Sequence, residues 1–120
     1  MIDHMSLKVK DFAKSKSFYE AALKPLGYKV AMQFGEAAGF GTSDHPDFWI
    51  GAGAGASPIH VAFAAKDRKT VDAFHQAALA AGGKDNGQPG IRAHYHPNYY
   101  GAFVFDPEGN NIEAVCHTPA

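Results

Sequence analysis

Seven histidines in 120 residues are the most unusual feature of this sequence, and two of them lie where strand-like alternation would place a ligand. His4 and His60 each stand in a short segment on the side opposite the large apolar residues, and Glu113 stands in the same way between Asn111 and Cys116. Two imidazoles and one carboxylate form a ligand set for a divalent metal ion that leaves positions open to water or substrate. These donors admit Fe(II), Mn(II), Zn(II), Ni(II) or Co(II).

An exposed surface histidine is the alternative interpretation of His4 taken alone. His60 favours the metal hypothesis, because it has the small neighbours Ala62 and Ala64 on its own side of the strand. Such small residues indicate a concave surface.

The two histidines occupy equivalent positions of an internal repeat. Residues 2–27 align without a gap on residues 58–83, at an offset of 56, and eight of the 26 positions are identical. Each copy predicts a strand, an aspartate N-cap (Asp11 or Asp67) and a helix that ends at glycine. Helical spacing assigns Val71, Phe74, Ala78 and Ala81 to one face of the second helix.

Strand-like runs follow each helix and complete the fold class. They cover 28–34, 37–42 and 47–51 in the first half and 91–96, 101–105 and 111–117 in the second. The Asp-Pro-Glu-Gly turn at 106–109 predicts a hairpin between the last two runs. We therefore expect an α+β fold of two βαβββ modules that form a cupped mixed sheet. In this cup, the first strands of the two halves lie side by side and bring their histidines together.

One domain spans residues 1–120, with a first module at about 1–51, a linker at 52–57 and a second module at about 58–120. The glycine-rich stretch 51–57 is interpreted as the linker. A strand follows it, whereas a phosphate-binding glycine loop leads into a helix.

Composition excludes several classes of partner. Eleven Lys and Arg against twelve Asp and Glu give a net charge of −1, without the basic excess that nucleic acid or an acidic membrane surface requires. No apolar run approaches the ~20 residues of a membrane helix. The single cysteine, Cys116, fits a reducing compartment and packing in the core, so we expect a cytoplasmic protein.

The doubled βαβββ plan, His4, His60 and the run Asp-Pro-Glu-Gly-Asn-Asn-Ile-Glu at 106–113 resemble the vicinal-oxygen-chelate superfamily. This group includes glyoxalase I, extradiol dioxygenases, fosfomycin-resistance thiol transferases and bleomycin-binding proteins. The resemblance covers nearly the whole chain. It implies that His4, His60 and Glu113 bind a divalent metal, that the substrate is a small molecule chelated through two adjacent oxygens, and that the protein forms a homodimer.

One expected ligand of glyoxalase I is missing. Alignment of the two final strands places Trp49 opposite Glu113, and an indole cannot bind a metal, although it can stack on a substrate. The remaining set of two histidines and one glutamate is similar to that of the extradiol dioxygenases and fosfomycin enzymes. Ser6 matches a hydroxyl position that the fosfomycin enzymes use, but their C-terminal arginine has no counterpart here.

A polar segment at residues 92–100 is the other candidate part of the site. We expect His96, or else His94, to act as a general acid or base and Arg92 to bind an anionic group. The remaining candidates, which would bind substrate by hydrogen bonds, are Tyr95, Tyr99 and Tyr100. The alternative is an edge strand and loop with exposed polar groups. By contrast, His45 and His75 are expected to be plain surface residues.

Two classes of function fit these residues. The first is a metal-dependent enzyme with lyase or isomerase, ring-cleaving dioxygenase or thiol-transferase chemistry, in which Glu113, His96 and Ser6 take part in catalysis. The second is a protein that sequesters a drug or metabolite among aromatic side chains without catalysis. The complete set of metal ligands favours the enzyme.

Overall fold

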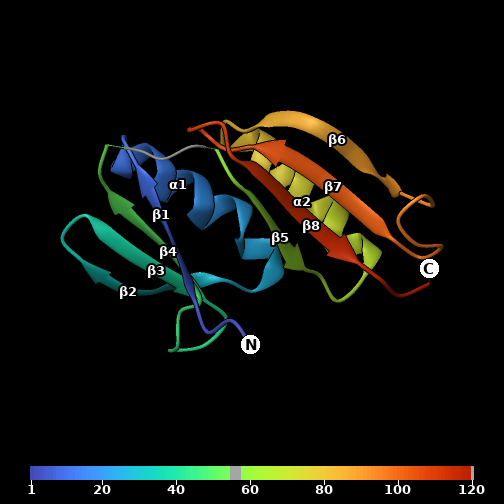
Figure 1. Cartoon of the computed structure of the whole chain (residues 1–120), viewed down its shortest axis with the longest axis horizontal. Helices are drawn as coiled ribbons and strands as arrows, with labels where there is room; N and C mark the ends of the chain where they lie inside the picture. The colour runs from blue at the N-terminus through green and yellow to red at the C-terminus, as the bar shows by residue number, and fades with distance from the viewer. Residues whose placement is uncertain (55–57, 120) are drawn as a thin grey trace.

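The computed structural model describes residues 1–54 and 58–119, and in it the chain forms two modules of the same design (Figure 1). The first module contains β1 (Met5–Val9), α1 (Phe12–Ala22), the short 3₁₀ helix η1 (Lys24–Leu26), β2 (Lys29–Phe34), β3 (Ala37–Gly41) and β4 (Phe48–Ala52). The second contains β5 (His60–Ala64), α2 (Arg68–Ala80), β6 (Lys84–Ile91), β7 (Tyr100–Phe105) and β8 (Asn111–Cys116). The predicted βαβββ pair is confirmed; residues 55–57 of the predicted linker lie outside the described residues.

Each module folds into its own four-stranded mixed sheet. The strand orders are β1-β4-β3-β2 and β5-β8-β7-β6; β1 and β5 run parallel to the final strand of their module, and the other pairs are antiparallel. The predicted hairpin of residues 101–105 with 111–117 is therefore present as β7 and β8. Within the described chain β1 and β5 belong to separate sheets and do not pair, so the first strands of the two halves do not lie side by side as expected from the sequence.

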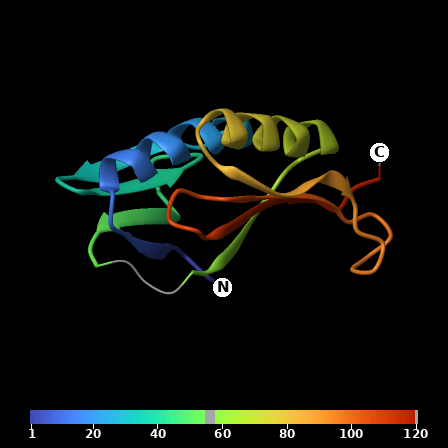
Figure 2. The same cartoon turned by 90° about the horizontal axis from the view of Figure 1, so that it is seen from above.

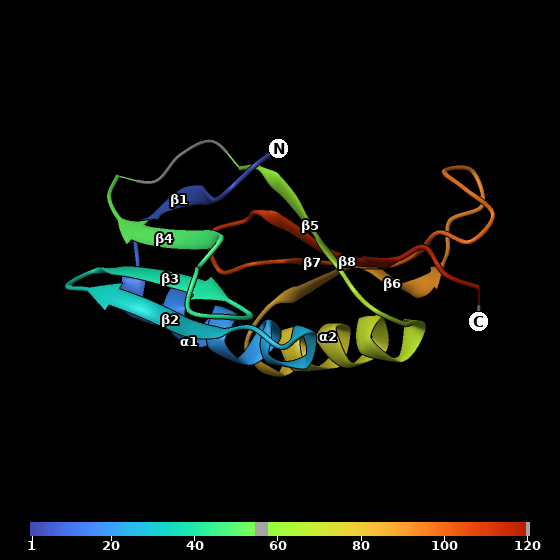
Figure 3. The ribbon, with the colours of Figure 1, turned by 90° about the horizontal axis from the view of Figure 1, so that it is seen from below.

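Both helices lie on the same side of the two sheets and contact each other (Figure 2). Asp11 and Asp67 begin them as predicted, since each carboxylate accepts a hydrogen bond from the backbone N–H three residues later. The predicted apolar stripe of α2 is buried at Val71, Phe74 and Ala78, and the side of each sheet that faces the helices is apolar. We call the opposite side of each sheet its open face (Figure 3).

The junction between the modules is aromatic. The rings of Phe48 in β4 and Phe63 in β5 meet edge to face with centroids 5.3 Å apart, and Tyr28 contacts Phe63 at the same distance. Side-chain packing of this kind, together with the contact of α1 with α2, joins the modules without a hydrogen-bonded ladder between their sheets.

The position of the strand after α2 was predicted wrongly. β6 covers Lys84–Ile91 and not 91–96, although this segment contains Gly87, Pro89 and Gly90. Those residues are tolerated because β6 is an edge strand, and its register against β7 shifts at two places. Residues 92–99 consequently form a loop beyond the end of the sheet.

The prediction that His75 is a surface residue was also wrong. Its side chain on α2 is only 5% exposed, and Nε2 donates to Oδ1 of Asp85 on β6 at 2.9 Å. The bond from His75, followed by that from the N–H of Gly87, holds the pKa of Asp85 below its usual value. Helix and edge strand are thus joined by a hydrogen bond between a buried imidazole and a carboxylate.

The turn at 106–109 connects the second module to α1 of the first. The Tyr19 hydroxyl, which is fully buried, donates to Oδ2 of Asp106, and the same carboxylate accepts hydrogen bonds from the backbone N–H groups of Glu108 and Asn110 and from the amide of Asn110. Glu108 in turn accepts from the N–H of Asp11 at 3.0 Å. A buried carboxylate is stable here because all its donors are supplied by the fold.

None of the helices in residues 1–54 and 58–119 is long and apolar enough to span a membrane.

Substituting Tyr19 tests the buried connection between the modules. Tyr19→Phe removes one hydrogen bond to a buried carboxylate, so we expect the free energy of unfolding in urea to fall by about 1.5–3 kcal/mol. Tyr28→Phe is the matched control, because the Tyr28 hydroxyl donates to the exposed carboxylate of Asp47 and water can replace it there. Equal losses in the two variants would contradict the role assigned to Tyr19.

The hydrogen bond between His75 and Asp85 predicts a pH dependence of stability. The folded state lowers the pKa of Asp85, so the ionised carboxylate stabilises the folded state. This stabilisation is complete above the unfolded-state pKa of about 4 and is lost as the pH falls through the lowered pKa. Below about pH 4, the wild type should therefore lose stability more steeply than Asp85→Asn. Urea midpoints measured between neutral and acidic pH check this, and parallel curves would refute it.

Candidate metal centre

Glu113 is the buried charge around which the second module's open face is organised. Its side chain is 1% exposed. Oε1 accepts a hydrogen bond from Nε2 of His60 at 2.8 Å, and Oε2 accepts one from the Tyr99 hydroxyl. Burial, followed by the hydrogen bond to Glu113, raises the pKa of Tyr99, so that this phenol is a donor at neutral pH. The fold thus supplies a partner for each oxygen of the carboxylate.

The strands explain how these groups meet. β5 and β8 are parallel neighbours, with Ala62 beside Glu113, so His60 reaches the carboxylate diagonally across one strand pair. Gly101 on β7 leaves the necessary room, because a Cβ there would lie 3.2 Å from Oε2 of Glu113 and 3.2 Å from Cε1 of Tyr99. A side chain at this position would push the tyrosine and the carboxylate apart.

His60 and Glu113 fit two positions of a metal site. Two donors that bind one ion at about 2.1 Å and at a right angle stand about 3 Å apart, and the observed separation of Nε2 and Oε1 is 2.8 Å. The side chain of His60 is 51% exposed, so the pair is accessible from the open face. An ion would take the place of the proton that Nε2 now donates.

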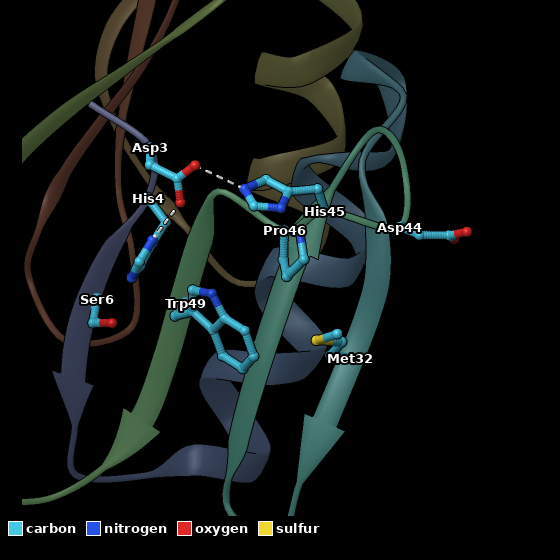
Figure 4. Close-up of a pocket in the computed structure, with 8 residues that line it drawn as sticks. All are labelled: Asp3, His4, Ser6, Met32, Asp44, His45, Pro46 and Trp49. Atoms are coloured by element: carbon cyan, nitrogen blue, oxygen red, sulfur yellow. Dashed lines mark hydrogen bonds and ion pairs between the residues drawn. The ribbon is translucent and has the colours of Figure 1, made fainter. Parts of the chain in front are cut away.

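His4 lies in the other module, in a hollow of about 320 Å³ on the open face of the first sheet (Figure 4). Its Nδ1 donates to Oδ2 of Asp3 at 2.7 Å, and Nε2 of His45 donates to Oδ1 of the same carboxylate at 2.9 Å. These bonds, that of His4 first, hold the pKa of Asp3 below its usual value. A carboxylate on one ring nitrogen is the usual support of a metal-binding histidine, and it leaves Nε2 of His4 for a ligand.

A single chain does not bring the three predicted ligands together. Across residues 1–54 and 58–119, no group of three His, Cys, Asp or Glu side chains is arranged to hold a metal ion. The pair of His60 and Glu113 belongs to one sheet and His4 to the other, and these sheets are not joined through β1 and β5. One chain therefore offers two ligands of the triad on one open face and the third on another.

Trp49 occupies the place in the first module that Glu113 occupies in the second. Ser6 pairs with Trp49 in the parallel ladder, as Ala62 pairs with Glu113 in the other, and Ser6 and Ala62 are equivalent in the repeat. The alignment made from the sequence was correct at this point. Trp49 and Ser6 both line the hollow beside His4.

The loop at 92–99 separates the other candidates from one another. Tyr99 contacts Glu113, whereas Tyr95 is exposed and its ring packs against that of Tyr99. His96 accepts a hydrogen bond from the N–H of Asn98 and packs edge-on against His117. Among the described contacts, Tyr99 and not His96 is hydrogen-bonded to the buried carboxylate.

Arg92 and Tyr100 have other partners. The Arg92 guanidinium donates to the carbonyl oxygens of Gly90 and Gln88 and lies over the ring of Phe103, so two of its nitrogens are already engaged. The Tyr100 hydroxyl donates to Asp72 of α2 at 2.6 Å, on the helix side of the sheet. Tyr100 therefore supports the fold and does not line the open face.

The sequence interpretation missed Asp3 and His45 as neighbours of His4. Asp3 was recognisable only as an acidic residue adjacent to His4. His45 lies 42 positions further along, and no pattern in the sequence connects it with Asp3.

Comparison with known proteins decides the family. A sequence model of the Glyoxalase/Bleomycin resistance protein/Dioxygenase superfamily matches residues 1–114. The chain belongs to this superfamily. A comparison with curated proteins gave no match.

Among solved structures, the chain is similar to a glyoxalase/bleomycin resistance protein from Albidiferax ferrireducens T118, with 30% identity, a TM-score of 0.83, and coverage of 95% of this chain and 97% of that one. A glyoxalase/bleomycin resistance protein/dioxygenase family enzyme from Burkholderia phytofirmans PsJN has 18% identity and a TM-score of 0.76, over 98% of both chains. An E144Q mutant of glyoxalase I from Zea mays has 19% identity and a TM-score of 0.70, over 95% of this chain and 44% of that one. The last two comparisons concern the fold alone. This superfamily chain thus shares its architecture with a glyoxalase.

Removing the Tyr99 hydroxyl tests the environment of Glu113. In Tyr99→Phe a buried carboxylate oxygen loses its donor, so we expect the free energy of unfolding to fall by about 1.5–3 kcal/mol. Tyr95→Phe, in the same loop but exposed, should change it by less than about 0.5 kcal/mol. The same loss in both variants would show that the loop, and not the bond to Glu113, determines the effect.

Proposed function

We propose that this protein is a metal-dependent enzyme acting on a small molecule, with a divalent ion held by His60, Glu113 and His4. The observation that carries the proposal is the pair of His60 Nε2 and Glu113 Oε1, 2.8 Å apart on an open face, with the carboxylate buried. A buried carboxylate is costly without partners, and a buried carboxylate bonded to an accessible histidine is the arrangement of a ligand pair prepared for an ion. When bound, the ion acts as a Lewis acid and stabilises negative charge on substrate oxygens.

The third ligand, in this proposal, comes from a second copy of the chain. His4 has its Nδ1 bound to Asp3 and its Nε2 available, but it lies on a different sheet from Glu113. A homodimer in which the open face of one chain's first module meets the open face of the partner's second module brings the two halves of the site together. Twofold symmetry then creates two equivalent sites.

The chain's own residues have distinct tasks in such a site. Tyr99 holds Oε2 of Glu113 and so directs Oε1 toward the ion. Asp3 fixes the ring of His4, and Ser6, next to His4 in the same hollow, offers a hydroxyl to the substrate. These tasks suit lyase, isomerase, dioxygenase or thiol-transferase chemistry, in each of which substrate oxygens gain charge.

Metal analysis tests the ligand set. Purified wild type should carry about one divalent ion per chain, and His4→Ala, His60→Ala and Glu113→Ala should each lose it while keeping the far-ultraviolet circular dichroism of the wild type. His94→Ala, from the exposed loop, is the control and should keep the ion. Wild type that neither retains nor binds added Zn²⁺, Mn²⁺, Fe²⁺, Co²⁺ or Ni²⁺ would refute the metal-dependent function.

Mixing two variants tests whether the site is shared between chains. After His4→Ala and Glu113→Ala chains are unfolded together and refolded, half of the dimers contain one of each, and one site in each such dimer has all its ligands. Bound metal should therefore return to about a quarter of the wild-type amount, although neither variant binds metal alone. No recovery, despite mixed dimers seen by mass spectrometry, would contradict the shared site.

Sequestration of a drug or metabolite is the second candidate, favoured by the aromatic residues exposed on the first module's open face. Such binding needs no ion. Stoichiometric binding of bleomycin that persists in a strong chelator would support sequestration, whereas turnover that depends on the ion would support the enzyme.

A further inference from the structure

The indole of Trp49 lies flat against the first sheet. A Cβ added at Gly39, the partner of Trp49 on β3, would come within 2.7 Å of Cε2 and Cζ2 of the indole. The benzene part of the indole therefore covers the backbone of Gly39, and a side chain at this position would displace it. Figure 4 shows the ring extending from β4 across the neighbouring strand.

Two further side chains lie near the indole. The added Cβ at Gly39 would also meet Cβ of Pro46 at 2.9 Å, so Pro46 borders the same spot, and Pro46 is itself buried. The ring of Phe34 on β2 is nearly parallel to the indole, at an interplanar angle of 10° with centroids 6.4 Å apart. Trp49 is only half-buried, while Phe34 is 67% exposed, so this apolar surface faces the solvent.

The hollow of about 320 Å³ has this flat surface at one side and polar groups at the other. His4, Ser6, Asp3 and His45 line it together with Trp49. Asp3 is already engaged by both histidines, and Asp44, which also lines the hollow, is fully exposed and lies 3.7 Å from Nζ of Lys29. The remaining polar groups are ring nitrogens and a hydroxyl, which form hydrogen bonds with neutral oxygen substituents. No lysine or arginine is among its lining residues in the described chain.

We propose that this hollow binds the planar aromatic ring of a small molecule, with the ring stacked on Trp49 and its oxygen substituents directed toward His4 and Ser6. This proposal names the substrate class for the proposed function. Only the presence of an ion next to His4 rests on that function, whereas the stacking on Trp49 does not. A half-buried indole that lies against the sheet offers a flat surface, and such a surface favours planar rings over saturated ones.

Trp49 and Glu113 occupy equivalent positions of the internal repeat. At the same ladder position, one module has a ligand, Glu113, and the other has a stacking surface, Trp49. In the shared site the two face the same substrate: the metal side binds its oxygens and the indole side binds its ring.

The single tryptophan of the chain allows a direct test, since it gives one indole N–H signal in a proton–nitrogen correlation spectrum. The probes are 2-naphthol and its saturated counterpart decahydro-2-naphthol, which share a hydroxyl and differ in planarity. Metal-free and Zn²⁺-loaded wild type are titrated with each. We expect 2-naphthol to shift the indole signal saturably through its ring current, and decahydro-2-naphthol to bind more weakly with little shift.

Gly39→Ala is the decisive variant, because it displaces the indole without removing it. Its affinity for 2-naphthol, measured by calorimetry, should fall about three- to tenfold. Gly51→Ala is the matched control on the same strand as Trp49. In the described chain its Cβ would approach Glu36 O and Lys8 Nζ no closer than 3.9 Å, so the affinity should stay unchanged. Trp49→Leu should lose affinity at least as strongly as Gly39→Ala.

Failure of the stacking proposal can be distinguished from failure of the proposed metal-dependent function. Equal binding of the two probes, or a Gly39→Ala affinity equal to that of the wild type, overturns the stacking inference even if the protein binds metal. A shift of the indole by tetramethylammonium and not by 2-naphthol also overturns it, in favour of a cation site. Planarity-dependent binding by a protein that binds no metal supports the stacking surface and refutes the proposed metal-dependent function alone.

Discussion

The burial of the Glu113 carboxylate is the constraint on which the second module's open face depends. A carboxylate that is 1% exposed is costly unless each oxygen has a partner, and here His60 and Tyr99 supply them from β5 and from the residue before β7. The small residue Gly101 is required beside them for the same reason. The identities of these residues are thus linked by one electrostatic requirement, and the requirement is also that of a ligand held ready for a cation.

The first module uses the same backbone differently. Its ladder brings Ser6, Trp49 and Gly39 into one row, where the second module has Ala62, Glu113 and Phe103. Its carboxylate, Asp3, lies outside the sheet, is exposed, and orients His4. The two modules therefore share the scaffold, while one open face has a buried carboxylate and the other has a flat indole beside polar side chains.

Much of the fold followed from local patterns. Alternation located most strands, aspartate N-caps and glycines located the helix ends, and the turn at 106–109 located a hairpin. The pattern failed at β6, because an edge strand need not alternate and tolerates proline, and at His75, because a helical histidine opposite an aspartate of another element gives no local signal. His4 and His60 could be named from the repeat and Glu113 from strand alternation, but their partners Tyr99, Asp3 and His45 could not.

The sequence by itself determined the two modules and the residues His4, His60 and Glu113 as a chemically capable set, since these depend on side-chain type and on periodicity along the chain. Its match to the superfamily model over residues 1–114 gave the family. Only the tertiary structure decided that His60 and Glu113 meet and that His4 belongs to a separate face. That division depends on how α1 packs on α2 and on how Phe48 meets Phe63. Such contacts join residues that are distant in the chain and produce no periodic pattern in the sequence. The separation of His4 from His60 and Glu113 is therefore decided by tertiary packing alone.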